Sequence, residues 1–547
     1  MRRFLVPAVV LLLLSTACRQ QERSPEAVPT GTTPVRGGTL VVALASDPAH
    51  LNPAITTAGE IHAASEILYN GLLSLNEKGE PEPDLAASLP KIEQNGAVYR
   101  FTLRDGVMWH DGQPLTSADV KFSFEEVLLK FHARTKASME PAIESIETPD
   151  EKTVVFRFKS PYAPFLQQLD VTEAPIVPKH VFEGTDPNTN PANVAPVGSG
   201  AFKFGSFTKG TEIRYVANEN YFKKDLPYLD EVVMRIITDE PTRVAALERG
   251  EVDWIPGVPG PDLSRLKANS AIETAETNWN PGGANCIMTI SFNLDRPMFR
   301  DVSVRRALAH GLDRKQFLDQ ILFGQGKVAI APISSGIPWA HATEVNLPEF
   351  DPDRAAQLLE EAGWKRQTSG PRMAQGVAGV PDGTMLSFSF LHFPQFSKYG
   401  ELVRQQLAAV GAEVTQRPLD PAAFRDAVFA KDDFDTNIIS YCNATDPEIG
   451  VRRMYHSDQI GEVPFTNSSH YSNPRVDSLF DQSGKEVDLN ERGRLYREVQ
   501  GILADDTPYI WVVETLSVRA HAARCSGFIH HNGLFTESAY CEAADSS

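Results

Sequence analysis

Short runs of β-branched residues alternate with amphipathic helical segments along most of this 547-residue chain. Residues 154–158 and 510–513 are typical of strands. Asp351 predicts the N-cap of a helix, with Pro352 in its first turn and Gly363 at its end. This alternation predicts an α/β fold. Because a chain of this length exceeds what one hydrophobic core supports, we expect two or three domains.

The N-terminus predicts export from the cytoplasm. Two arginines precede an apolar segment at residues 4–14, and small residues come directly before Cys18. This arrangement resembles the lipobox of bacterial lipoproteins, which implies a signal peptide at residues 1–17 and a lipid on the Cys18 thiol. An ordinary secretory signal is the alternative, and export follows from either. The apolar segment is shorter than the about 20 residues that a membrane-spanning helix needs.

The segment after Cys18 predicts a flexible tether. Residues 18–36 are polar, rich in proline, serine, threonine and glycine, and carry no periodic apolar residues. We therefore expect the folded body to begin at Gly37 and to stand at the periplasmic or outer face of a membrane, held there by lipid alone.

Charge and motifs argue against several classes of function. The formal net charge of −19 disfavours nucleic acid and anionic membrane surfaces as partners. The sequence contains no phosphate-binding loop, nucleophile elbow, zinc-protease motif or dinucleotide fingerprint. We therefore expect a binding protein and not an enzyme, without a cofactor or a metal site, and a monomer.

Four cysteines remain after Cys18, and four thiols allow three pairings. Cys525 and Cys541 would close a short loop near the end of the chain, and Cys286 and Cys442 would then form a long-range link.

Six segments follow one another in a fixed order along the mature chain. They are YNGLL to PDLA (69–86), FTLRDGVMWHDGQPLT (101–116), GSGAFKF (198–204), NENYF (218–222), FN to VRRALA (292–309) and AAQLLEEAGW (355–364). In this order they resemble the family 5 extracellular solute-binding proteins, which serve ABC importers of peptides, nickel and related solutes.

The resemblance implies a two-lobed fold of the type II periplasmic-binding-protein class, with an additional α/β domain inserted in the first lobe. Such lobes close on a ligand like a clam shell. On this mapping, the hinge strands fall near residues 287–293 and 509–513. The first lobe comprises residues 37–74, 198–291 and 509–547, the additional domain residues 75–197, and the second lobe residues 292–508.

The resemblance also implies a role. The protein would capture a small solute in the cleft between its lobes and deliver it to the transmembrane subunits of an ABC permease. An oligopeptide or peptide-like solute is favoured, with an oligosaccharide or a metal chelate as alternatives. An exported enzyme or a ligand sensor that reuses the fold is the other class of interpretation.

Two stretches are expected to line the cleft. Asp47, His50 and Asn52 follow the first strand, at the kind of strand end where α/β clefts form. The loop at residues 440–447 approaches from the second lobe, and Trp279 stands before a hinge strand as an aromatic platform. Related oligopeptide-binding proteins have a disulfide across this region, which supports the Cys286–Cys442 pairing.

The loop at residues 440–447 supplies Tyr441, Asn443 and Asp446 as candidate ligand contacts. In peptide-binding relatives this loop reads like ADYxDP, and its first aspartate pairs with the ammonium group of the ligand. Asn443 occupies that position here. An amide cannot neutralise a buried ammonium, so the residue favours neutral or blocked ligands over peptides with a free amine.

Overall fold

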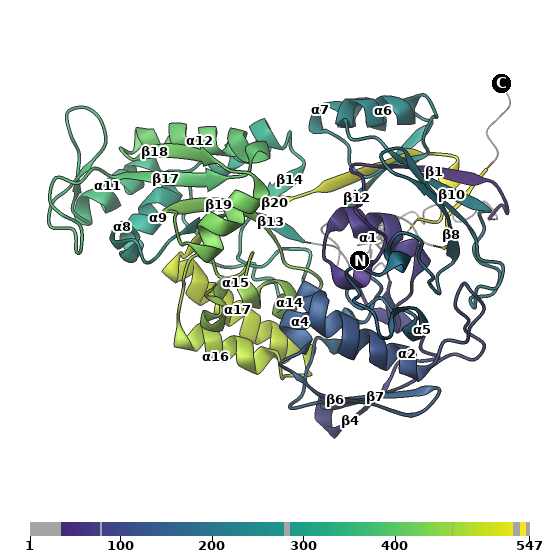
Figure 1. Cartoon of the computed structure of the whole chain (residues 1–547). Coiled ribbons are helices and arrows are strands. Elements are labelled where there is room, and N and C mark those ends of the chain that lie inside the picture. The colour runs from purple at the N-terminus through teal and green to yellow at the C-terminus, as the bar shows by residue number, and fades with distance from the viewer. Residues whose placement is uncertain (1–33, 77–78, 278–284, 462, 529–536, 543–547) are drawn as a thin grey trace, which may run out of the picture.

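The computed structural model describes residues 34–76, 79–277, 285–461, 463–528 and 537–542 (Figure 1). Cys18 and Trp279 lie outside these ranges. In the described part of the chain, no helix is both long enough and apolar enough to cross a membrane.

A seven-stranded sheet forms the core of the first lobe. Its strands, in spatial order, are β12 (Ile272–Thr277), β21 (Ser517–Ala522), β11 (Trp254–Ile255), β1 (Thr39–Leu44), β10 (Glu231–Ile236), β9 (Glu212–Ala217) and β8 (Phe202–Thr208). Helices α6 (Glu240–Glu248) and α7 (Gly260–Lys267) pack Val244 and Leu266 against one face. Helix α1 (Gly59–Ser65) packs against the other.

A six-stranded sheet organises the second lobe. Its spatial order is β14 (Gly326–Val328), β20 (Tyr509–Thr515), β13 (Cys286–Phe292), β19 (Thr436–Cys442), β17 (Ser387–His392) and β18 (Glu413–Pro418). Both faces are covered, because nearly every residue of β13 and β20 is buried. Helices α9 (Val302–His310), α11 (Pro352–Glu361) and α12 (Ser397–Ala409) share a core with one face, and α16 (Pro474–Ser483) and α17 (Leu489–Asp506) share one with the other.

The inserted segment builds a four-stranded antiparallel sheet in the order β4 (Lys91–Glu93), β5 (Val98–Thr102), β7 (Thr153–Phe158) and β6 (Ile143–Asp150). Helices α2 (Ser117–Phe122) and α4 (Ala133–Met139) belong to the same unit. Its buried aromatics Phe101 and Phe156 join one continuous cluster with Leu40 and Met234 of the first sheet. The inserted unit and the first lobe therefore share one hydrophobic core.

The chain passes between the two large sheets at two places. β12 and β21 pair in the first sheet, whereas β13 and β20 pair in the second. The crossings are therefore the stretch from β12 to β13 and Leu516 between β20 and β21. The two strands expected at the hinge, near residues 287–293 and 509–513, correspond to β13 and β20. Both belong to the second sheet, where β13 pairs with β19 and β20, and β20 also pairs with β14.

Two disulfides are present, in the pairing that the sequence favoured. Cys286–Cys442 joins the adjacent ends of β13 and β19, and Cys525–Cys541 joins the short strands β22 (Cys525–Ser526) and β23 (Tyr540–Cys541). The first bridge stands at the end of the second sheet that faces the crossing from the first lobe.

Candidate functional site

Asp446 has a structural role in the loop that follows β19. Its Oδ1 accepts from the Glu448 amide at 2.9 Å and so caps helix α14 (Pro447–Gly450). Its two oxygens also accept from the Arg492 guanidinium at 2.7 and 2.8 Å. The carboxylate is only 1% exposed. Asp446 thus fixes the loop on α17, and a direct ligand contact would have to displace Arg492.

Asn443 is fully buried in the same loop, and its amide orientation is set by a backbone group. Its Oδ1 accepts from the Ser334 amide at 2.7 Å. A backbone N–H can only donate, so the side-chain oxygen must face it and the NH₂ group must point the other way. Nδ2 is buried and has no hydrogen-bond partner in the described part of the chain. Asn443 therefore presents an unused donor.

Tyr441 is a core residue in this structure. Its hydroxyl donates to the Thr466 carbonyl at 2.8 Å, and its ring meets Tyr509 edge-on. The guanidinium carbon of Arg453 stands 5.6 Å from the ring centre. Burial raises the pKa of the Tyr441 hydroxyl well above its usual value. The ring of Tyr441 supports the Arg453 guanidinium.

A buried carboxylate lies beside Asn443. Glu514, in β20, is 1% exposed, and its Oε2 accepts from the Ser334 hydroxyl at 3.1 Å. The same oxygen accepts from the Ser335 amide at 3.1 Å and the Ser335 hydroxyl at 2.7 Å. Ser334 therefore links the two side chains: its hydroxyl donates to Glu514 and its backbone amide donates to Asn443.

A cavity of about 330 Å³ lies between the inserted unit and the second lobe, and we call it the interdomain cavity. Figure 1 shows α4 beside α14 in this region. The charged and polar side chains that line the interdomain cavity include those of Arg134, Tyr162, Glu448, Arg452, Arg453 and Asp481. The cavity brings together groups contributed by different lobes.

Two of the three arginines that line this cavity, Arg134 of the inserted unit and Arg453 of the second lobe, are differently paired. Arg134 donates through Nε to both oxygens of Glu173 at 2.8 and 2.9 Å. Arg453 donates to the carbonyls of Phe465 at 2.7 Å and Gly450 at 3.2 Å. Among the described residues, Arg453 has no carboxylate partner, and burial lowers the pKa of its guanidinium. A ligand carboxylate or carbonyl would meet a cation here.

Two acidic side chains near the cavity, Glu448 and Asp170, have carboxyl pKa values raised above the ordinary range. Burial raises the pKa of Glu448 to about 7, with repulsion from Asp446 adding to the effect and Arg452 opposing it. Burial likewise raises the pKa of Asp170 to about 7, helped by the neighbouring carboxylates of Glu173 and Glu66. Perturbed acids in one region are typical of a functional site.

The three residues predicted after β1 form a local turn. Asn52 caps a short helix through the Ala54 amide at 3.0 Å and donates to Asn193 at 2.8 Å. His50 Nδ1 accepts from the Asn52 amide at 3.2 Å, and burial lowers the His50 pKa. Asp47 has one buried oxygen without a partner among the described residues. None of the three lines the interdomain cavity.

Two further tryptophans, the buried Trp109 and the partly buried Trp339, are engaged in packing. Trp109 is 2% exposed. Trp339 packs edge-on against Tyr496, and the Arg492 guanidinium carbon lies 5.1 Å from its ring centre.

Sequence reasoning missed Arg134, Arg453, Glu448 and Glu514. Glu514 alone had a local signal, since it is a charged residue at the end of the apolar run YIWVV. The other three lie on short helices whose pattern does not distinguish a solvated charge from one that faces a cavity.

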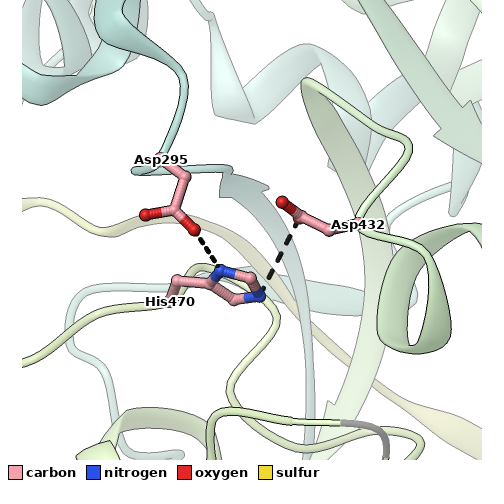
Figure 2. Close-up of side chains that lie close together, drawn as sticks. All are labelled: Asp295, Asp432 and His470. Atoms are coloured by element: carbon pink, nitrogen blue, oxygen red, sulfur yellow. Dashed lines mark hydrogen bonds and ion pairs between the residues drawn. The ribbon is translucent and has the colours of Figure 1, made fainter.

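A histidine flanked by two aspartates lies at the other end of β13 and β19 (Figure 2). His470 Nδ1 is 2.6 Å from Asp295 Oδ2, and its Nε2 is 3.9 Å from Asp432 Oδ1. One oxygen of each aspartate and one histidine nitrogen lie within 4.8 Å of one another. These contacts hold three loops together.

Comparison with known proteins gives consistent similarities. Residues 80–462 match the model of the bacterial extracellular solute-binding proteins, family 5 Middle. Protein XP55 of Streptomyces lividans is 31% identical over 538 residues, which span 95% of this chain and 91% of XP55. The oligopeptide-binding protein AppA of Bacillus subtilis is 28% identical over 536 residues, which span 96% of this chain and 94% of AppA.

Solved structures share the fold. The structure of Bacillus subtilis AppA in complex with a nonapeptide aligns with a TM-score of 0.77 at 26% identity, covering 93% of this chain and 100% of AppA. NikZ from Campylobacter jejuni, in complex with Ni(L-His), aligns with a TM-score of 0.76 at 24% identity, covering 90% of this chain and 97% of NikZ. The likeness to NikZ concerns the fold alone. These alignments confirm the expected mixed α/β fold.

Proposed function

Because the chain belongs to the family 5 bacterial extracellular solute-binding proteins of ABC transporters, a family of binding proteins and not of enzymes, we propose that it captures a peptide-like solute between its lobes. The observation that carries this proposal is the interdomain cavity, where Arg453 of one lobe, without a carboxylate partner among the described residues, faces Arg134 of the other.

The cavity favours a ligand that carries a carboxylate or several carbonyl groups. Arg453 brings to this cavity a guanidinium group that has no carboxylate partner among the described residues, and a ligand anion would supply one. A peptide offers a terminal carboxylate and a row of carbonyl oxygens. AppA, which aligns over most of the chain, was solved with a nonapeptide, which supports the same class of ligand.

Release would require the lobes to separate. The inserted unit touches the second lobe directly, since the Ala163 amide donates to the Gly484 carbonyl at 3.0 Å. Leu516, where the chain passes from β20 to β21, would lie at the hinge. A ligand that contacts both lobes stabilises the closed state through those contacts, and the closed state is then delivered to the permease.

Membrane attachment would follow from the N-terminus. A lipid on Cys18 and the polar segment after it would tether the protein beside its permease without a spanning helix.

Native mass spectrometry of the protein without its signal peptide tests the proposal. A co-purified adduct that denaturation releases intact would be expected, and its mass would identify it as a peptide, an oligosaccharide or a metal chelate. Free protein would then be titrated with a defined pool of di- to nonapeptides. A ligand at 100 times its Kd should stabilise the fold by about 2.7 kcal/mol. Turnover of the adduct, or no stabilisation by any pool member, would contradict the proposal.

A further inference from the structure

The two lobes also meet on the side of the hinge that lies away from the interdomain cavity. Gly260 is the first residue of α7 in the first lobe, and Phe323 lies in the turn before β14 of the second lobe. A Cβ atom at residue 260 would lie 2.6 Å from Phe323 Cδ2 and 2.7 Å from Phe323 Cβ. Any side chain larger than that of glycine would therefore have to displace Phe323.

Leu516 lies between this contact and the interdomain cavity. Figure 1 shows α7 on one side of the passage from β20 to β21, and α4 with α14 on the other. Backbone bonds hold both partners of the contact beside this passage. The Leu516 amide donates to the Gln325 carbonyl at 3.4 Å, and the Val258 amide donates to the Val518 carbonyl at 2.8 Å. A rotation about Leu516 that separates the inserted unit from the second lobe therefore moves α7 toward Phe323.

The turn that carries Phe323 is fixed against the strand that leads to Leu516. Gly326, at the start of β14, pairs with Thr515, and a Cβ at residue 326 would lie 2.6 Å from the Glu514 carbonyl oxygen. Phe323 has a φ of +52°, which bulky residues rarely adopt, and its side chain is 52% exposed. Neither backbone preference nor burial in a core explains a phenylalanine at this position, whereas the contact with Gly260 does.

Opening of the lobes has opposite effects on the two sides of Leu516. On the cavity side, it would break the hydrogen bond from the Ala163 amide to the Gly484 carbonyl. On the other side, Gly260 and Phe323 are already in contact and have no room to approach further. We propose that Phe323 is a stop that limits how far the lobes open, and that the absence of a side chain at Gly260 sets the angle at which this stop engages.

Such a stop adjusts ligand affinity without touching the ligand. When only the closed state holds the ligand on both sides, the apparent Kd depends on the fraction of free protein that is closed. The inference concerns the movement of the lobes and goes beyond the peptide-binding function proposed above. Its test uses ligand-free protein, so failure of peptide binding would leave the test unaffected.

The separation of the lobes can be measured by pulsed dipolar EPR on protein without its signal peptide and Cys18. Spin labels at Glu144→Cys in β6 and Asn490→Cys in α17 report it, since both positions are exposed. Gly260→Ala should raise the ratio of short-distance to long-distance populations at least about fivefold, because the added methyl group makes the stop engage earlier. Gly257→Ala is the matched control and should change nothing, because a Cβ there has no neighbour within 4 Å among the described residues.

Removal of the stop is the second arm of the test. Phe323→Gly suits the φ of +52° and should add a longer-distance population. In that background Gly260→Ala should no longer shift the distribution, because no Phe323 side chain remains to meet the methyl group. Equal distributions for wild type and Phe323→Gly would overturn the proposal, as would a Gly260→Ala shift that persists without the phenylalanine. The Phe323→Gly arm decides the matter even if Gly260→Ala does not fold.

Discussion

Arg492 and Asp446 form a bidentate ion pair inside the second lobe, with nitrogen–oxygen distances of 2.7 and 2.8 Å. The arginine comes from α17 and the aspartate from the loop after β19. The guanidinium also lies 5.1 Å from the ring centre of Trp339. The pair determines where the loop carrying Asn443 stands, so the loop's position depends on a helix far away in the sequence.

Replacing Arg492 with Met should destabilise the protein, because Asp446 would be left buried without its partner. Loss of one member of a buried pair costs about 3–5 kcal/mol. Chemical denaturation followed by tryptophan fluorescence measures the free energy of unfolding. The control is Arg494→Met on the same helix, where an exposed ion pair with Glu491 should be worth about 1 kcal/mol or less. Equal effects of the two changes would contradict the structural role given to Arg492.

The elevated pKa of Glu448 predicts a specific pH dependence. Its folded value is about 7 against an ordinary 4.5, so the folded protein holds a proton that the unfolded chain has lost between these pH values. The associated stability is present in full below pH 4.5 and is lost as the pH rises through 7. Glu448→Gln should flatten the decline in unfolding free energy between pH 5 and pH 7.5, by roughly 1–3 kcal/mol. An unchanged slope would show that Glu448 ionises normally.

The two disulfides should differ in their effect on ligand binding. Cys442 adjoins Asn443, and its bridge to Cys286 closes a sequence separation of 156 residues, whereas Cys525–Cys541 closes 16. Replacing either pair with serine should lower stability by about 2–5 kcal/mol. Only the Cys286→Ser/Cys442→Ser protein should also lose affinity for its co-purified ligand, because the loop after β19 would be released. Parallel affinity losses in both proteins would argue against a local effect.

Arg453→Ala should weaken ligand binding more than it weakens the fold. The guanidinium is held by carbonyl groups, so its removal leaves no stranded carboxylate among the described residues. Loss of a charge-assisted contact of about 1.5–3 kcal/mol corresponds to a rise in Kd of roughly ten- to a hundredfold. Thermal-shift titration with the identified ligand measures this change. Arg404→Ala, on the exposed face of α12, should leave Kd unaltered.

Cys18→Ser should release the protein from the membrane. Without the thiol there is no acylation, and the described chain offers no spanning helix in its place. Metabolic labelling with palmitate and detergent phase partitioning in a bacterial host should show label and detergent-phase protein for the wild type alone. Retention of the variant in the detergent phase would refute lipid anchoring at this residue.

Local physics determined much of the secondary structure from sequence alone. Helix α11 begins after Asp351, whose carboxylate accepts from the Arg354 amide at 2.9 Å, and has Pro352 in its first turn. The chain leaves it at Gly363, whose φ of +90° suits glycine. These features depend on residues within a few positions of one another. The order of the six family segments likewise predicted the family and its mixed α/β fold.

The site was decided by tertiary structure. Asp446 and Asn443 were found from a local motif, but the motif could not show that Arg492 pairs with one and that Ser334 orients the other. Sequence alone also gave no reason to bring Arg134 and Arg453 to one cavity. The strength of an ionic or hydrogen-bonded contact depends on distance, burial and the partner's identity. Those quantities are set where segments distant in the sequence meet. Residue types and their spacing therefore determined the helices, the strands and the family, whereas the contacts of the site side chains were determined only by the assembled lobes.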